Sequence, residues 1–103
     1  MAKVEIGESS VGTTVRVASG DEVQLTLPET RTAGYTWRVV SAEAPVFAVR
    51  DGGFVPAKGV GGSGLHRWTI TPTNAGTATL ELAYGRSWES EAGKRFQVTI
   101  VVS

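Results

Sequence analysis

The stretch Ala78-Thr79-Leu80-Glu81-Leu82-Ala83-Tyr84 decides the fold class of this chain, because its larger apolar side chains recur at every second position. Successive side chains of a β-strand point to opposite faces of the sheet, so this spacing predicts a strand with one buried face. No segment carries apolar residues at helical spacing over three turns, and Gly, Pro, Thr and Val are too frequent for a long helix. We therefore expect an all-β protein.

The same alternation recurs on both sides of this stretch and is interrupted by turn signals such as Ser19-Gly20-Asp21 and Asp51-Gly52-Gly53. Half-buried strands of this kind cannot cover their apolar faces in one open sheet, so two sheets must pack face to face. We predict an immunoglobulin-like two-sheet sandwich of seven or eight mostly antiparallel strands, with Trp37 in its core and Tyr84 tying a strand end through its hydroxyl. The predicted strands are 2–6, 13–18, 22–28, 35–41, 46–50, 65–71, 77–84 and 94–102.

Length and composition limit the classes of function. The 103 residues fit a single domain over 1–103, and the absence of cysteine excludes disulfides, thiolate catalysis and Cys-based zinc sites. Ten basic residues balance ten acidic ones, so we expect neither nucleic acid nor a membrane surface as a partner, and we expect a monomer. Residues 1–8 carry two acidic side chains and no uninterrupted apolar run, so we expect them to be neither a signal nor an anchor; the chain as written suits the cytoplasm, or the periplasm or exterior if a signal peptide was removed.

The interest lies in three long connections, predicted at 28–34, 51–64 and 85–93. The second contains Gly59-Val60-Gly61-Gly62-Ser63-Gly64, which satisfies the dinucleotide-binding pattern G-x-G-x-x-G. That pattern works at the N-terminus of a helix, whereas the residues that follow, 65–72, form a strand pattern ended by proline. We therefore predict no nucleotide and no other cofactor.

Residues suited to catalysis are few. His66 is the only histidine, it has no second histidine at metal-ligand spacing, and we place it on the outer face or rim of a strand. No serine lies in a nucleophile-elbow pattern. Glu89 and Glu91 could act as the acid and base of a glycosidase, because that reaction uses two carboxylates. With Lys94 and Arg95 nearby, we instead expect them to be surface charges on a solvated loop. We expect no enzymatic activity, no catalytic residue and no metal site.

The same three connections carry motifs that resemble those of the chagasin-type inhibitors of papain-like cysteine peptidases. That family is marked by Asn-Pro-Thr-Thr-Gly-aromatic-x-Trp, then Gly-x-Gly-Gly, then Arg-Pro-Trp. This chain has Thr30-Arg31-Thr32-Ala33-Gly34-Tyr35-Thr36-Trp37, Gly59-Val60-Gly61-Gly62 and Arg86-Ser87-Trp88, in the family's order. The first motif keeps one threonine, the glycine, the aromatic residue and the tryptophan; the third keeps arginine and tryptophan. The resemblance spans about residues 15–102.

The resemblance implies a reversible, non-covalent inhibitor that enters the active-site cleft of a papain-like cysteine peptidase with the first connection and grips the cleft walls with the other two. It places Thr32 near the catalytic cysteine and histidine of the enzyme and Trp88 against an aromatic wall, and it gives Arg86 the role of supporting its own loop or pairing with an acid. An anchor of this kind is typical of interface hot spots. The implied peptidase-binding residues are Arg31, Thr32, Ala33, Gly34, Tyr35, Gly59, Val60, Gly61, Gly62, Arg86, Ser87 and Trp88.

A second hypothesis, from another class of function, remains open at this point. An immunoglobulin-like adhesion or carbohydrate-binding module would stack sugars on an exposed aromatic ring, for which Trp88 or Trp68 are the candidates. Titration of papain with a fluorogenic peptide separates the two hypotheses: the first predicts stoichiometric or competitive loss of activity, and the second predicts no change at micromolar concentrations of the chain.

Overall fold

The chain forms eight β-strands and one short 3-10 turn in a computed structural model, which describes residues 3–30, 35–42, 46–56, 63–86 and 94–103. The number of strands agrees with the alternation of apolar residues in the sequence. The elements are β1 Lys3–Gly7, η1 Glu8–Ser10, β2 Thr14–Val17, β3 Glu22–Thr30, β4 Tyr35–Ala42, β5 Phe47–Pro56, β6 Ser63–Pro72, β7 Gly76–Arg86 and β8 Lys94–Val102.

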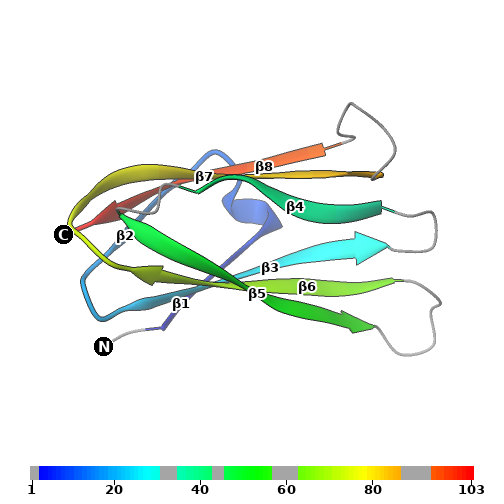
Figure 1. Ribbon diagram of the computed structural model, residues 1–103, viewed down its shortest axis with the longest axis horizontal. Coiled ribbons are helices and arrows are strands. Elements are labelled where there is room, and N and C mark those ends of the chain that lie inside the picture. The colour runs from blue at the N-terminus through cyan, green and yellow to red at the C-terminus, as the bar shows by residue number, and fades with distance from the viewer. Residues whose placement is uncertain (1–2, 31–34, 43–45, 57–62, 87–93) are drawn as a thin grey trace.

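The strands form two four-stranded sheets that pack face to face, with strand orders β1-β3-β6-β5 and β2-β8-β7-β4 (Figure 1). The β1–β3 and β2–β8 pairs are parallel, and all other pairs are antiparallel. Between β1 and β2, η1 carries the chain from one sheet to the other. Apart from β2, these orders correspond to the two sheets of an immunoglobulin constant-type sandwich, so the predicted fold class is confirmed.

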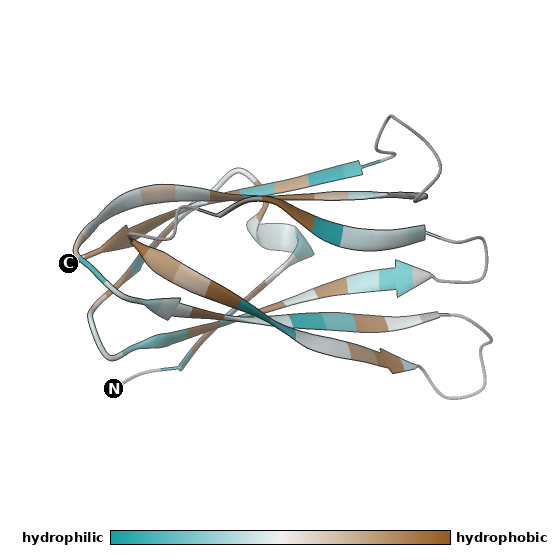
Figure 2. Ribbon diagram, in the orientation of Figure 1, coloured by the Kyte–Doolittle hydropathy of each residue, from teal (hydrophilic) through white to brown (hydrophobic). Residues whose placement is uncertain are grey.

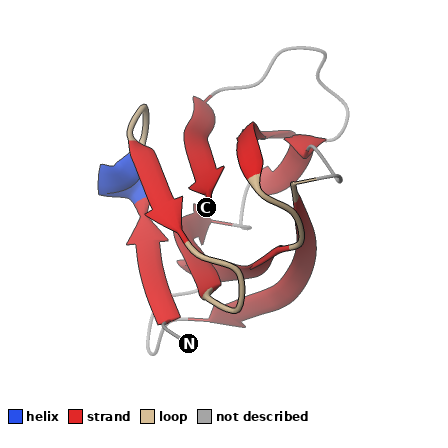
Figure 3. Cartoon of the chain, turned by 90° about the vertical axis from the view of Figure 1, so that its left-hand side faces the viewer, coloured by secondary structure: helices blue, strands red, loops and turns tan. Residues whose placement is uncertain are grey.

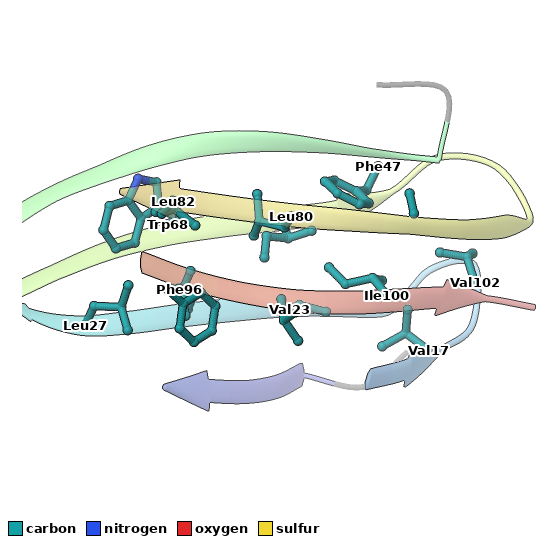
Figure 4. Close-up of a cluster of buried hydrophobic side chains, with 14 of the residues drawn as sticks. Val17, Val23, Leu27, Phe47, Trp68, Leu80, Leu82, Phe96, Ile100 and Val102 are labelled. Atoms are coloured by element: carbon teal, nitrogen blue, oxygen red, sulfur yellow. The ribbon is translucent and has the colours of Figure 1, made fainter. Parts of the chain in front are cut away.

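The core lies between the two sheets, which curve around it in the view from one end (Figure 3). Hydropathy alternates along most strands (Figure 2), and the apolar members of each alternation point inward, as Leu80 and Leu82 do in β7. Figure 4 shows side chains of both sheets meeting in this layer. Full burial of a side chain of this size contributes about 1.5 to 3 kcal/mol. The buried hydrophobic residues are Val17, Val23, Leu25, Leu27, Trp37, Phe47, Trp68, Ile70, Ala78, Leu80, Leu82, Ala83, Phe96, Val98, Ile100 and Val102.

One predicted boundary is wrong. The sequence Asp51-Gly52-Gly53 predicted a turn that ends a strand at residue 50, whereas β5 continues to Pro56. The three residues form a β-bulge: Asp51 pairs with Trp68 and Gly53 pairs with Arg67, the preceding residue of β6, so Gly52 is extra. Gly53 has a φ of 93° and donates its backbone N–H to the Asp51 Oδ1 over 2.7 Å. Residues typical of turns thus bend the strand without ending it.

Candidate functional site

Three connections of the chain leave and re-enter the sandwich at the same end, which lies on the right in Figure 1. These connections are residues 31–34 between β3 and β4, residues 57–62 between β5 and β6, and residues 87–93 between β7 and β8. The opposite end holds the turns at 18–21 and 73–75. The strand ends that flank all three candidate motifs are therefore on one side of the molecule.

The order of these strand ends places the first connection between the other two. The connection 31–34 crosses from one sheet to the other, because β3 pairs with β6 and β4 pairs with β7. At this end Thr30 lies opposite Ser63, the first residue of β6, and Tyr35 lies opposite Arg86, the last residue of β7. The second connection thus ends, and the third begins, directly beside the two strand residues that flank the first.

Most of the predicted binding residues lie outside the described part of the chain. These are Arg31, Thr32, Ala33, Gly34, Gly59, Val60, Gly61, Gly62, Ser87 and Trp88; the predicted loop charges Glu89 and Glu91 lie outside it as well. Tyr35 and the backbone of Arg86 are described, and they are register partners across β4 and β7. The assignment of the twelve residues to a peptidase contact stays a prediction.

Aromatic rings support the bases of the first and third connections. The Tyr35 ring stacks on Tyr84 with a centroid distance of 5.4 Å and an interplanar angle of 20°. The Trp37 ring contacts the same Tyr84 ring at 4.8 Å, and the Lys94 Nζ lies 5.9 Å from its centroid. Such pairs contribute about 0.5 to 1.5 kcal/mol beyond the area that they bury. Trp37 is 7% exposed, which confirms it as a core residue.

Trp37 also closes the base of the first connection by two hydrogen bonds. Its backbone N–H donates to the Glu29 Oε2 over 2.8 Å, and its Nε1–H donates to the Pro28 carbonyl over 2.8 Å. Both bonds join β4 in one sheet to β3 in the other. They fix the relative positions of the strands that bear residues 31–34.

Replacing Trp37 with phenylalanine is expected to lower the free energy of unfolding by about 1 to 3 kcal/mol. Phenylalanine keeps an aromatic ring beside Tyr84 but has no ring N–H, so the Pro28 carbonyl loses its donor, and it fills less of the core. Urea unfolding followed by circular dichroism measures the change. A loss below about 0.5 kcal/mol would show that this cross-sheet contact contributes little.

A close approach of two strands forms the base of the second connection. Gly64 lies opposite Pro56 in β5 and opposite Glu29 in β3. A Cβ at Gly64 would overlap the carbonyl oxygen of Val55 and would come within 2.9 Å of the Pro56 Cα. Glycine is therefore required here because only a residue without a side chain lets the two backbones come this close.

The predicted position of His66 is wrong, because its side chain is buried and not on an outer face or rim. It is 4% exposed and shares the inward face of β6 with Trp68 and Ile70. Its ring stacks on Trp68 with a centroid distance of 4.1 Å and an interplanar angle of 6°. Its Nδ1 lies 2.9 Å from the Glu29 Oε2, and its Nε2 lies 2.7 Å from the Asp51 Oδ1.

Glu29, which the sequence analysis did not single out, is a buried carboxylate with an exposure of 1%. Its position continues the inward series Leu25 and Leu27 in β3. The same alternation places His66 in line with Trp68 and Ile70. The alternation of inward and outward side chains along β3 and β6 was therefore the signal that Glu29 and His66 are buried. Their polarity alone pointed to the wrong positions.

Burial also removes one candidate of the carbohydrate-binding hypothesis. Trp68 is 2% exposed and belongs to the core, so its ring offers no face for a sugar. Trp88 lies outside the described residues.

Within the described ranges, no three His, Asp or Glu side chains gather in a way that would hold a metal ion. No helix in those ranges has the length and apolar character to cross a membrane.

A sequence model described as "Chagasin family peptidase inhibitor I42" matches residues 16–100 of the chain. The chain belongs to the chagasin family. Chagasin of Trypanosoma cruzi is 34% identical to it over an alignment of 95 residues that covers 84% of this chain and 86% of chagasin. Amoebiasin-1 of Entamoeba histolytica is 30% identical over 93 residues, which are 89% of this chain and 91% of that protein.

A solved structure agrees with the fold. The cysteine protease inhibitor EhICP2 of Entamoeba histolytica superimposes with a TM-score of 0.87 at 22% identity, over 99% of this chain and 96% of that one. The family resemblance found in the three motifs is confirmed, and with it the expectation that a chagasin family chain is a peptidase inhibitor and not an enzyme.

Proposed function

We propose that this chain is a reversible, non-covalent inhibitor of papain-like cysteine peptidases that blocks their active-site cleft with three connections at one end of the sandwich. Residues 31–34 enter the cleft, while residues 57–62 and 87–93 contact its two walls. The peptidase does not cleave the inhibitor, and no covalent bond forms between the two proteins.

The observation that carries the proposal is the order of the strand ends. The two strands that bear residues 31–34 are flanked by β6 on one side and by β7 on the other. A cleft with two walls needs a central element with one neighbour on each side. The strand register supplies this arrangement from the fold itself.

Most of the predicted residues have a distinct role in this arrangement. Thr32 offers its hydroxyl and backbone groups to the polar atoms of the catalytic centre, and Trp88 packs against an aromatic wall. The glycines at 59, 61 and 62 let backbone approach backbone, as the absence of a Cβ permits. Arg86 supports the third connection, next to Tyr35 in register. Arg31, Ala33 and Ser87 depart from the family pattern and adjust the fit to a particular peptidase.

The scaffold supports tight binding because it holds the bases of the connections in place before the peptidase arrives. The hydrogen bonds from Trp37 to Pro28 and Glu29, together with the stacking of Tyr35 on Tyr84, restrict the strand ends. Association then orders fewer degrees of freedom, and more of the contact energy appears as affinity.

Titration of papain with this chain, followed by hydrolysis of a fluorogenic peptide, tests the proposal. We expect inhibition that is competitive with the peptide, reversible on dilution, and free of cleavage of the inhibitor, as shown by an unchanged mass. Full papain activity at micromolar concentrations of the chain would contradict the proposal. A matched control is the variant with residues 31–34 replaced by Gly-Ser-Gly-Ser, which should unfold like the wild type and should not inhibit.

A further inference from the structure

One buried carboxylate oxygen joins three strands from both sheets beneath the proposed binding end. The Glu29 Oε2 accepts the backbone N–H of Trp37 over 2.8 Å and lies 2.9 Å from the His66 Nδ1. Glu29 is in β3, His66 is in the neighbouring β6, and Trp37 is in β4 of the opposite sheet. The side chains of Glu29 and His66 are 0% and 5% exposed.

The contact continues through the other ring nitrogen of His66 to β5. The His66 Nε2 lies 2.7 Å from the Asp51 Oδ1, and this oxygen also accepts the backbone N–H of Gly53 over 2.7 Å. Asp51 itself is 61% exposed in its side chain and sits in the β-bulge. Hydrogen bonds to ionised groups are roughly twice as strong as neutral ones. A continuous series of contacts therefore links Trp37, Glu29 and His66 to the β-bulge at Asp51.

These residues lie on the four strands that bear two of the three proposed contact segments. Glu29 and Trp37 flank residues 31–34 on β3 and β4, and Asp51 and His66 flank residues 57–62 on β5 and β6. One network therefore touches all four strands that bear the first and second connections. The loss of a single member would free strand ends that belong to different sheets.

We propose that Glu29 is a positioning residue of the inhibitor, which holds the first and second connections in one fixed arrangement so that they enter the peptidase together. This inference rests on the proposed function. Its physical basis is preorganisation: an inhibitor whose binding arrangement is only fractionally populated binds more weakly by that fraction. Glu29 does this without touching the peptidase, because it lies within the core.

The substitution Glu29→Gln tests the inference, because glutamine keeps the shape of the side chain but loses the charge and places an amide NH₂ among donors. We expect inhibition of papain to weaken at least tenfold at a temperature where circular dichroism shows the variant fully folded. Most of the loss should appear as slower association, since fewer molecules are ready to bind. Asp51→Asn, at the exposed end of the network, should weaken inhibition about threefold by the same route.

Two controls separate positioning from general stability. Asp21→Asn alters a carboxylate that accepts the Ala18 backbone N–H over 2.9 Å, in a turn at the opposite end of the sandwich. Glu81→Gln makes the same chemical change as Glu29→Gln at a mid-strand position of β7, where Glu81 pairs with Arg95 of β8 at 3.0 Å. Both should keep the inhibition constant and the association rate within twofold of wild type, even where unfolding shifts.

Each outcome decides the question. Wild-type inhibition together with an unchanged association rate in Glu29→Gln would overturn the inference and leave the proposed function standing. Equal losses in Asp21→Asn and Glu29→Gln would overturn it too, since stability alone would then explain both. If Glu29→Gln does not fold, Asp51→Asn decides, and an unchanged rate in that variant overturns the inference. Failure of the wild type to inhibit would overturn the proposed function and this inference with it.

Discussion

Replacing Trp88 with alanine is expected to weaken inhibition of papain at least tenfold, a loss of about 1.4 kcal/mol or more in binding free energy. The third connection begins after Arg86, at the end of the sandwich that bears all three segments, so Trp88 follows two residues beyond the last strand residue. A tryptophan that fills a pocket of a partner is typical of a hot spot and contributes about 2 to 4 kcal/mol.

Fold stability separates a contact role of Trp88 from a core role. If Trp88 contacts the peptidase, the alanine variant should unfold at the same urea concentration as the wild type, and Trp88→Phe should retain part of the affinity. A marked loss of stability would instead place this side chain in the sandwich. Unchanged inhibition by the alanine variant would remove Trp88 from the contact set.

Replacing His66 with leucine is expected to lower the free energy of unfolding by about 2 to 4 kcal/mol, because a buried acceptor loses a hydrogen-bond partner and a stacked ring is removed from the core. Leucine leaves the Glu29 carboxylate, which is 1% exposed, without its contact at 2.9 Å. The contact between β6 and the Asp51 carboxylate is lost as well, and so is the ring stacked on Trp68. Urea unfolding followed by tryptophan fluorescence measures the change.

A matched control and a double variant sharpen this result. Arg95→Gln removes the partner of a glutamate in the exposed pair with Glu81, where the expected loss is about 0 to 1 kcal/mol. Replacing Glu29 and His66 together by leucine removes the buried charge itself, so the double variant should be more stable than His66→Leu alone. A loss below about 1 kcal/mol in His66→Leu would contradict a tightly coupled network.

Much of the fold was predictable because strand burial is local. The period-two patterns of 22–28, 77–84 and 94–102 placed three strands within about two residues of their observed ends, since each residue of a strand faces inward or outward by its position alone. Packing two half-buried sheets face to face then followed from the need to cover them. The sandwich is therefore encoded in short segments.

The errors arose where a contact distant in the sequence decides the outcome. Asp51-Gly52-Gly53 predicts a turn by its composition, but pairing with β6 carries the strand past it as a bulge. His66 was placed on an outer face or rim and Glu29 was not singled out, yet the two residues lie 37 positions apart in the chain and contact each other inside the core. The alternation of side chains along each strand places both residues inward, but no local pattern predicts that these two will contact each other.

The candidate site divides in the same way. The three motifs and their order were readable from the sequence because a family pattern is local, and membership of the chagasin family agrees with them. The strands that flank these motifs end on one side of the sandwich, with the strand ends of the first connection between those of the other two. This arrangement depends on strand pairing across the whole chain. The buried network beneath them depends on it as well.

A crystal structure of the complex with papain tests the central claim most directly, namely that one end of the sandwich carries the whole peptidase contact. We predict residues 31–34 in the active-site cleft, with residues 57–62 and 87–93 on its opposite walls and an intact inhibitor chain. A complex that is formed through the turns at 18–21 and 73–75, or through an outer sheet face, would contradict the account.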